Sequence, residues 1–215
     1  IVHLDQMSGV PAILNTVFGK IIAPNTTLPA WFVEGLATHY ESYLTAGGRE
    51  RSTVFDMFMR MDVLEDRLLR LDEMTAEADR WPHGNISRLY GSRFCDFIHK
   101  HYGQQALTMF GQEYGRQIIP FALNRMALRA TGKTFATLYR EFLGEASERY
   151  LAASAAIRDQ GLIEGERLTF HGEHARAPRF MRDGRVIYFA SDGHVHSHLR
   201  AIDGTEMLRA GGNVT

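Results

Sequence analysis

Apolar residues recur at helical spacing along roughly the first three quarters of the chain. From about Leu4 to Arg158 they fall at intervals of three and four residues, and loop-forming residues separate the segments. The pattern predicts helices over about 5–20, 29–44, 53–69, 86–102, 104–115, 119–132 and 135–160. We therefore expect this part of the chain to be all-helical.

Residues that favour helix ends mark several of these boundaries. Pro29 suits the first turn of the second segment, and Thr27 can help to cap it. Ser52 can cap the third segment, and Gly103 is expected to end the fourth. Thr134 precedes the longest segment and opens it. The predicted boundaries therefore rest on end signals as well as on the period.

After Gly161 the period of the pattern changes from 3.6 to two. Short β-rich runs, among them RLTF and RVIYF, alternate with turns that contain Asp-Gly: RDGR, SDGH and IDGT. Short strands separated by such turns are typical of a propeller blade or a small meander. A single blade cannot bury both of its faces, so we expect the β part to continue beyond Thr215.

The two periods divide the chain into two predicted parts. The first is a helical part over 1–160, and the second contains the first strands of a β-propeller or meander over 161–215. A hydrophobic content of 45% is that of a globular protein. The predicted fold class is mainly α, with a few β-strands after the helices.

Charge and cysteine content narrow the classes of partner. The 24 basic and 25 acidic side chains nearly cancel, and no segment gathers a basic cluster. We therefore expect no nucleic-acid partner. The longest apolar runs are interrupted by charge before the roughly 20 residues that cross a bilayer, so we expect no membrane-spanning segment. The single cysteine, Cys95, cannot form an internal disulfide and leaves the compartment open.

Glu34 stands out in the second predicted helix because large apolar residues surround it in the run WFVEGL. A rotation of about 100° per residue places Glu34 on one stripe with three polar residues, which are Thr38, Glu41 and Thr45. A solvated polar stripe is the plain interpretation of this spacing.

The flanks of this stripe are small residues, which are Ala30, Gly35, Ala37 and Ser42. Small side chains let another element approach closely. A carboxylate that a second helix reaches in this way is able to serve as a metal ligand, because Zn²⁺ accepts carboxylate oxygens at about 2.0 to 2.2 Å. Such a site needs further ligands, usually histidines.

The segment PNTTLPAWFVEGLATHYES resembles the third-ligand segment of gluzincin metallopeptidases, the superfamily of thermolysin and the membrane-alanyl-type aminopeptidases. It is most similar to that of the bacterial peptidase-MA-like proteins, which join this domain to a TolB-type propeller. In that family a W-x-x-E-G-L-A helix supplies a zinc-binding glutamate. The resemblance therefore assigns Glu34 as the third ligand of a Zn²⁺ ion. The segments TAGGRERS, RLYGSRF and MRDGRVIYFASDG extend the resemblance over nearly the whole chain.

The same family pattern places an H-E-x-x-H helix upstream of such a segment, and no H-E-x-x-H occurs in the 215 residues. The two zinc-binding histidines and the general-base glutamate are therefore absent from this sequence. We interpret the chain as a fragment of a zinc peptidase that begins just after the motif and is inactive by itself. The alternative is a non-catalytic module, helical and then propeller, that binds a protein or peptide.

The resemblance also suggests roles for three other residues. Tyr90, in RLYGSRF, is a candidate for the phenol that steadies the oxyanion in related aminopeptidases, with a packing tyrosine as the alternative. His3 and Glu41 are candidates for contacts with the zinc-bound histidines. The alternatives are a packed or exposed histidine at position 3 and a solvated glutamate at position 41. A peptide or protein substrate, and a periplasmic or secreted location, follow from the resemblance in the same way.

The remaining histidines form two groups. His194, His196 and His198 alternate along one predicted strand, where they are able to hold a divalent metal or form an exposed strand face. His99 and His101 lie two positions apart on a helix and face different sides, so we expect them to be surface residues that share no metal.

Overall fold

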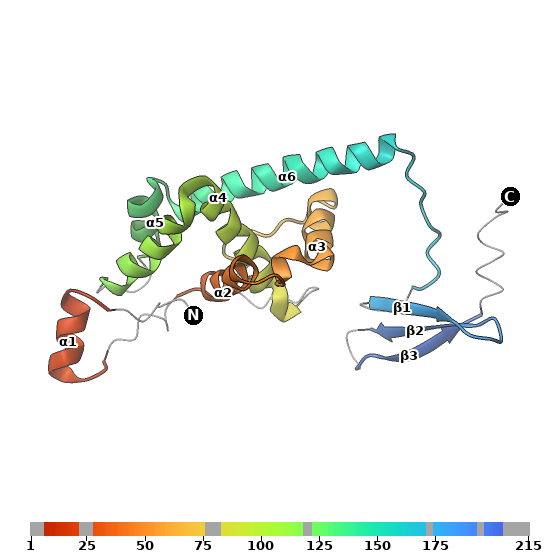
Figure 1. Ribbon diagram of the computed structural model, residues 1–215, viewed down its shortest axis with the longest axis horizontal. Coiled ribbons are helices and arrows are strands. Elements are labelled where there is room, and N and C mark those ends of the chain that lie inside the picture. The colour runs from red at the N-terminus through yellow and green to blue at the C-terminus, as the bar shows by residue number, and fades with distance from the viewer. Residues whose placement is uncertain are drawn as a thin grey trace. The chain divides into compact units, whose positions relative to one another are not determined.

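The computed structural model describes residues 7–21, 28–75, 83–117, 122–170, 174–192 and 196–203. The chain divides into two compact units, Ile1–Ala156 and Ile157–Thr215. Figure 1 shows helices in the first unit and a small sheet in the second. The predicted fold class, mainly α with a few β-strands after the helices, is confirmed.

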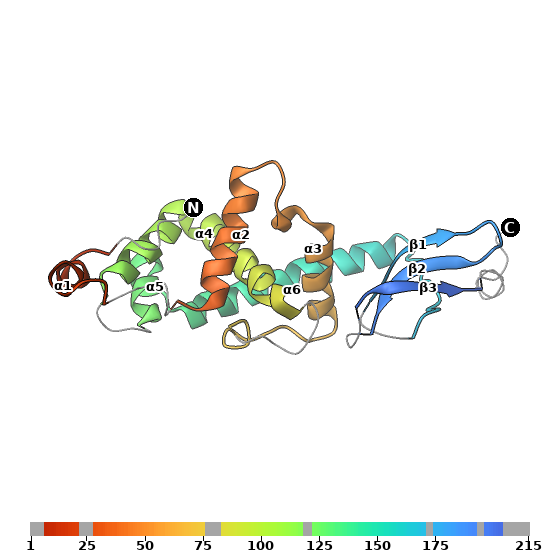
Figure 2. The same ribbon diagram turned by 90° about the horizontal axis from the view of Figure 1, so that it is seen from below.

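Six α-helices and two short 3-10 turns make up the described part of the helical unit. In chain order they are α1 (Val10–Phe18), α2 (Ala30–Leu44), η2 (Arg49–Arg51), α3 (Thr53–Leu64), η3 (His83–Asn85), α4 (Ile86–Gly115), α5 (Leu123–Thr131) and α6 (Phe135–Asp159). Figure 2 shows α2, α3 and α4 together in the middle of this unit. None of the helices in the described ranges is both long and apolar enough to cross a bilayer.

Most of the predicted end signals act as expected. The Ser52 hydroxyl accepts a hydrogen bond from the amide of Phe55 at 3.5 Å, and the Thr134 hydroxyl accepts one from the amide of Thr137 at 3.2 Å. Gly103 interrupts the helical backbone of α4 with a φ of 78°, and α4 then resumes. Thr27 lies outside the described residues.

Two helices are shorter than the period predicts, for local reasons. α1 begins only at Val10, because Gly9 before it has a φ of 67° and Pro11 occupies its first turn. α3 ends at Leu64 instead of near residue 69, because Asp66 adopts a left-handed φ of 52°. Period alone does not reveal such a turn.

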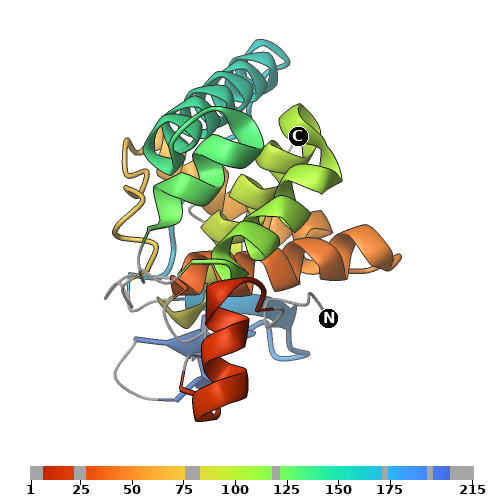
Figure 3. The same ribbon diagram turned by 90° about the vertical axis from the view of Figure 1, so that its left-hand side faces the viewer.

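The core of the helical unit lies where α2 crosses α4. A Cβ atom on Gly35 would overlap the backbone of Gly91, so the two helices approach as closely as their backbones allow. Aromatic rings then fill the space beside the crossing, which are those of Trp31, Phe32, Phe94, Phe110, Phe135 and Phe142. Figure 3, which turns α1 toward the viewer, shows α2 and α4 running in different directions behind it.

The second unit contains an antiparallel meander of three strands in the order β1-β2-β3, namely β1 (His174–Phe180), β2 (Val186–Ser191) and β3 (His198–Ile202). The RDGR turn joins β1 to β2, with Gly184 at a φ of 86° and the Met181 amide donating to the Arg185 carbonyl at 2.7 Å. The run RLTF, which the sequence predicts to be a strand, is irregular instead. Continuation into a propeller stays a prediction.

Candidate functional site

Glu34 lies on α2 directly beside the crossing with α4. Its side chain is 42% exposed, and its carboxylate forms an ion pair with Nη2 of Arg88, on α4, at 3.0 Å. Buried Trp31, Phe32 and Leu36 hold α2 in place around it. The prediction that small residues next to Glu34 admit a second element is confirmed by the contact between Gly35 and Gly91.

The rest of the predicted polar stripe is only partly solvated. Thr38 is fully buried, so the interpretation of the whole stripe as a solvated face is wrong at this position. Glu41 is half-exposed, and its carboxylate accepts hydrogen bonds from Nε and Nη2 of Arg49 at 3.0 and 2.7 Å. An arginine is thus the partner of Glu41 in this chain, and its suggested contact with a zinc-bound histidine stays a prediction.

Tyr90 lies in the core, although the resemblance suggests a catalytic phenol. The side chain is 1% exposed, and its hydroxyl donates to Oδ2 of Asp62, on α3, at 2.5 Å. This placement fits the packing alternative, because a buried phenol presents no surface to a substrate. His3 lies outside the described residues.

A second cluster of titratable side chains lies farther along α2. His39 is 2% exposed, and its Nδ1 lies 3.0 Å from Oε1 and 3.3 Å from Oε2 of Glu50 in η2. Its Nε2 lies 2.9 Å from Nδ1 of His99, which α4 supplies. Three elements therefore meet around one imidazole ring.

The loop between α2 and α3 folds back over α2 to bring Glu50 to His39. Gly48 turns the chain with a φ of 106°, and a Cβ atom there would overlap Ser42. The Ser42 hydroxyl accepts a hydrogen bond from the amide of Glu50 at 3.1 Å and donates to the carbonyl of Thr38 at 3.2 Å. Glycine at position 48 and a small hydroxyl at position 42 thus fix the position of Glu50.

Asp96, one turn before Lys100 on α4, completes the cluster. A ring nitrogen of His39, an oxygen of Glu50 and an oxygen of Asp96 all lie within 4.8 Å of one another. Oδ2 of Asp96 accepts a hydrogen bond from Nζ of Lys100 at 2.6 Å. A pocket of about 280 Å³ opens beside these groups, lined by His39, Ser42, Tyr43, Glu50, Arg51, Asp96, His99 and Lys100.

The electrostatics of the cluster follow from its burial. Burial raises the pKa of Glu50 above its ordinary value of 4.5, with His39 opposing the rise and the negative charge of Asp96 adding to it. Burial, together with the neighbouring His39, lowers the pKa of His99 below 6.5. Glu50 is therefore a stronger proton acceptor than an exposed glutamate, and the neutral form of His99 is favoured.

Sequence reasoning missed this cluster, and its assignment of His99 to the surface is wrong. The His99 ring is half-buried against His39 and Tyr43, with centroids 5.1 and 4.8 Å away. His101 is exposed as predicted and pairs with Glu145 at 2.7 Å. One signal was available: His39 follows Leu36 by three positions, so it lies on the apolar face, where a titratable group needs a partner.

The strand histidines do not gather as a ligand set in the described residues. His194 lies outside these residues, while His196 and His198 are exposed. Nδ1 of His198 donates to the His196 carbonyl at 3.1 Å, and its Nε2 accepts from Nε of Arg200 at 3.0 Å. Both nitrogens of His198 thus have protein partners, which fits the alternative of an exposed strand face.

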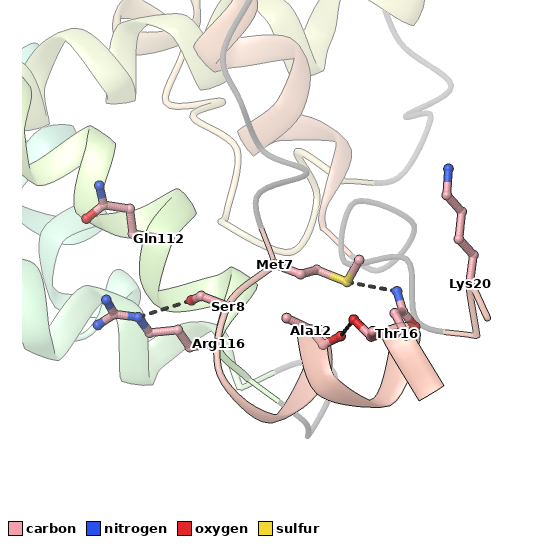
Figure 4. A pocket seen from close by; sticks show the side chains of 8 residues that line it. Met7, Ser8, Ala12, Thr16, Lys20, Gln112 and Arg116 are labelled. Atoms are coloured by element: carbon pink, nitrogen blue, oxygen red, sulfur yellow. Dashed lines mark hydrogen bonds between the residues drawn. The ribbon is translucent and has the colours of Figure 1, made fainter. Parts of the chain in front are cut away.

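A larger pocket of about 680 Å³ lies between α1 and the end of α4 (Figure 4). The Ser8 amide donates to the Gly115 carbonyl at 3.2 Å, and Nε of Arg116 donates to the Ser8 hydroxyl at 3.2 Å. The lining consists of Met7, Ser8, Ala12, Asn15, Thr16, Lys20, Gln112 and Arg116. It includes no carboxylate, imidazole or thiol, so the lining itself offers neither acid–base catalysis nor metal ligation near neutral pH.

Comparison with known proteins identifies no relative whose site could be set beside this geometry. No family model, no curated protein and no solved structure matches the chain.

Proposed function

We propose that this chain is part of a zinc-dependent metallopeptidase that hydrolyses peptide bonds, in which Glu34 is one of the zinc ligands. The two histidine ligands and the general base would come from an H-E-x-x-H helix in a longer chain. The observation that carries the proposal is the position of Glu34, a half-exposed carboxylate on a helix whose neighbouring residues are buried. The resemblance of its segment to gluzincins supplies the reaction, and with it a periplasmic or secreted location.

The residues around Glu34 fit one third of a zinc site. A carboxylate oxygen is an accepted zinc ligand, whereas one such ligand does not hold the ion by itself. The partner of Glu34 is the positive charge of Arg88, 33% exposed, which a metal ion would replace at the carboxylate. Bound zinc would polarise the peptide carbonyl and acidify a water molecule. Glu34 would contribute charge and geometry, because α2 holds its backbone rigidly.

The test begins with the coding sequence upstream of Ile1, where an H-E-x-x-H motif is expected. The longer protein is then purified, and its zinc content and peptide hydrolysis are measured. Glu34→Gln should lose one equivalent of bound zinc and lower hydrolysis at least about 100-fold, because a neutral amide is a poor zinc ligand.

Glu141→Gln is the matched control for this experiment. Glu141 is exposed to almost the same extent, 40%, and is also paired with a cation, Nζ of Lys133 at 2.7 Å, but on α6. This variant should keep both zinc and activity. Absence of the motif upstream, or full zinc content in Glu34→Gln, would overturn the proposal.

A protein-binding module without catalysis is the second candidate, and α1 favours it. Four large apolar side chains on this helix are exposed by roughly half or more, namely those of Val10, Ile13, Val17 and Phe18. Clustered exposed apolar residues mark contacts with other polypeptides. In this case the longer protein would hydrolyse no peptide, and Glu34→Gln would leave its zinc content unchanged. Substitution of Ile13 and Val17 by Ser would abolish partner binding.

A further inference from the structure

We propose that His39, Glu50 and Asp96 form a second metal site, which binds a divalent transition-metal ion such as Zn²⁺, and that His99 orients the His39 ring. All three proposed ligands lie in this chain, and none of them is a residue of the proposed peptidase centre. Three different elements supply it, since His39 is on α2, Glu50 in η2 and Asp96 on α4.

The donor atoms already lie close to the spacing that a metal requires. Ligands at about 2.1 Å from a tetrahedral zinc ion are separated from one another by about 3.4 Å. Nδ1 of His39 and Oε1 of Glu50 are 3.0 Å apart, and the oxygen of Asp96 lies within 4.8 Å of its two neighbours. A rotation of the Asp96 side chain that brings its oxygen to about 3.4 Å from the other two donor atoms would complete the set.

The hydrogen bonds around His39 favour a metal at Nδ1. A proton lies between Nδ1 and the Glu50 carboxylate, because a nitrogen lone pair and an unprotonated carboxylate 3.0 Å apart would repel. A metal ion takes the place of this proton. The metal-bound ring is neutral and carries its single proton on Nε2, and this N–H donates to Nδ1 of His99, 2.9 Å away.

The charges of the cluster also fit a divalent ion. Glu50 and Asp96 together bring two negative charges to a neutral imidazole, which an ion of charge two balances. Three cations face the cluster: Arg93 and Lys100 from α4, and Arg51 from η2. Lys100, which pairs with Asp96, is 61% exposed and is free to turn into solvent. The pocket of about 280 Å³ leaves room for a water molecule as fourth ligand.

The direct test titrates the 215-residue chain, freed of metal with a chelator, with zinc chloride. Isothermal calorimetry and equilibrium dialysis with elemental analysis should show one equivalent of zinc per chain. Glu50→Gln and Asp96→Asn should each weaken binding at least about tenfold, because each removes a ligand charge. Affinity should fall as the pH falls, because zinc displaces a proton from the cluster.

Two control variants separate this site from the other candidates. Glu34→Gln should bind zinc like the unchanged chain, so failure of the peptidase proposal leaves this one intact and the reverse also holds. A double variant, His196→Gln with His198→Gln, should also bind normally. Circular dichroism checks that each variant folds; Asp96 is on the surface side of α4 and decides the matter if Glu50→Gln does not fold.

His99 is a positioning residue in this proposal, and its variant has its own readout. His99→Gln should lower zinc affinity by about tenfold and shift the pH midpoint of zinc binding, while circular dichroism shows that the metal-free chain stays folded. The proposal is overturned if the chain binds no zinc at a free zinc concentration of about 100 µM. This concentration is about ten times a dissociation constant of about 10 µM, which is a moderate affinity. The proposal is also overturned if Asp96→Asn binds as tightly as the unchanged chain, or if only the double histidine variant loses zinc.

Discussion

Glu34 and Glu50 are two carboxylates held against the same pair of helices, yet their surroundings are opposite. Glu34 is 42% exposed and faces an arginine that is also partly in solvent. Glu50 is 12% exposed and faces a histidine that is almost completely buried. An exposed ion pair contributes about 0 to 1 kcal/mol to stability, because water screens it and replaces it readily. A buried polar pair is costly to break, because the remaining partner stays without solvent.

The difference shows where stability and ligand binding reside along one helix. Glu34 can exchange its partner for a ligand at small cost to the fold. Glu50 and His39 depend on each other, so a ligand there must replace the interactions that the pair already makes. Three sets of substitutions test this contrast. The first changes the helix crossing that both sites share, the second compares His39 with Glu34, and the third removes the titrating carboxylate of Glu50.

The largest effect is expected at the helix crossing that the two sites share. Gly35→Ala places a Cβ atom where the backbone of Gly91 lies, so α4 must move away from α2. We expect a loss of at least about 3 kcal/mol in the free energy of unfolding, measured by urea denaturation. The matched control is Gly144→Ala on α6, where an added Cβ meets nothing within 4 Å and should stabilise the helix by up to about 1 kcal/mol. Equal stability of the two variants would show that the helices do not meet at Gly35.

The next effect separates the two carboxylate sites. His39→Ala removes a buried ring and leaves Glu50 without its partner, so we expect a loss of about 3 kcal/mol. Glu34→Gln breaks an exposed pair and should cost less than about 1 kcal/mol. Both values come from urea denaturation in the presence of a chelator. A loss at Glu34 as large as that at His39 would contradict the contrast.

The smallest effect is a dependence on pH that Glu50 causes. The pKa of Glu50 is raised in the folded chain above 4.5, so the folded chain keeps a proton that the unfolded chain has released. Glu50 therefore contributes its full stability below pH 4.5 and loses it as the pH rises through the raised pKa. We expect the unfolding free energy of the chain, minus that of Glu50→Gln, to decrease as the pH rises from 4 to 7. A difference that increases with pH would show that His39, and not burial, dominates at Glu50.

Local signals account for the parts of the fold that the sequence predicts correctly. Ser52, Thr134 and Gly103 act through their own side chains or backbone freedom, so their roles can be recognised without knowledge of the rest of the molecule. The end of α3 depends on a left-handed φ at Asp66, which a period does not encode. The run RLTF has strand-forming residues but pairs with none of the three described strands.

The two sites also have some features that local sequence signals predict and others that depend on tertiary contacts. Helical spacing predicts that Glu34 reaches solvent, and the small flanking residues predict a neighbour beside it. The identity of that neighbour, Arg88, depends on how α4 returns to α2 from far along the chain. The same crossing buries Thr38, which spacing alone places in water. His39 and Glu50 meet only because Gly48 turns the loop back, so tertiary contacts create this cluster.

Gly103 kinks α4, so the helix is not straight along its length. An unbroken helix of 30 residues would extend about 45 Å in one direction. The half before Gly103 carries Arg88 and Asp96 to their partners on α2 and η2, and the half after it ends at Gly115, which binds Ser8 beside the pocket of Figure 4. One backbone angle at one residue thus sets the direction in which the α1 end of the helical unit points away from its two carboxylate sites.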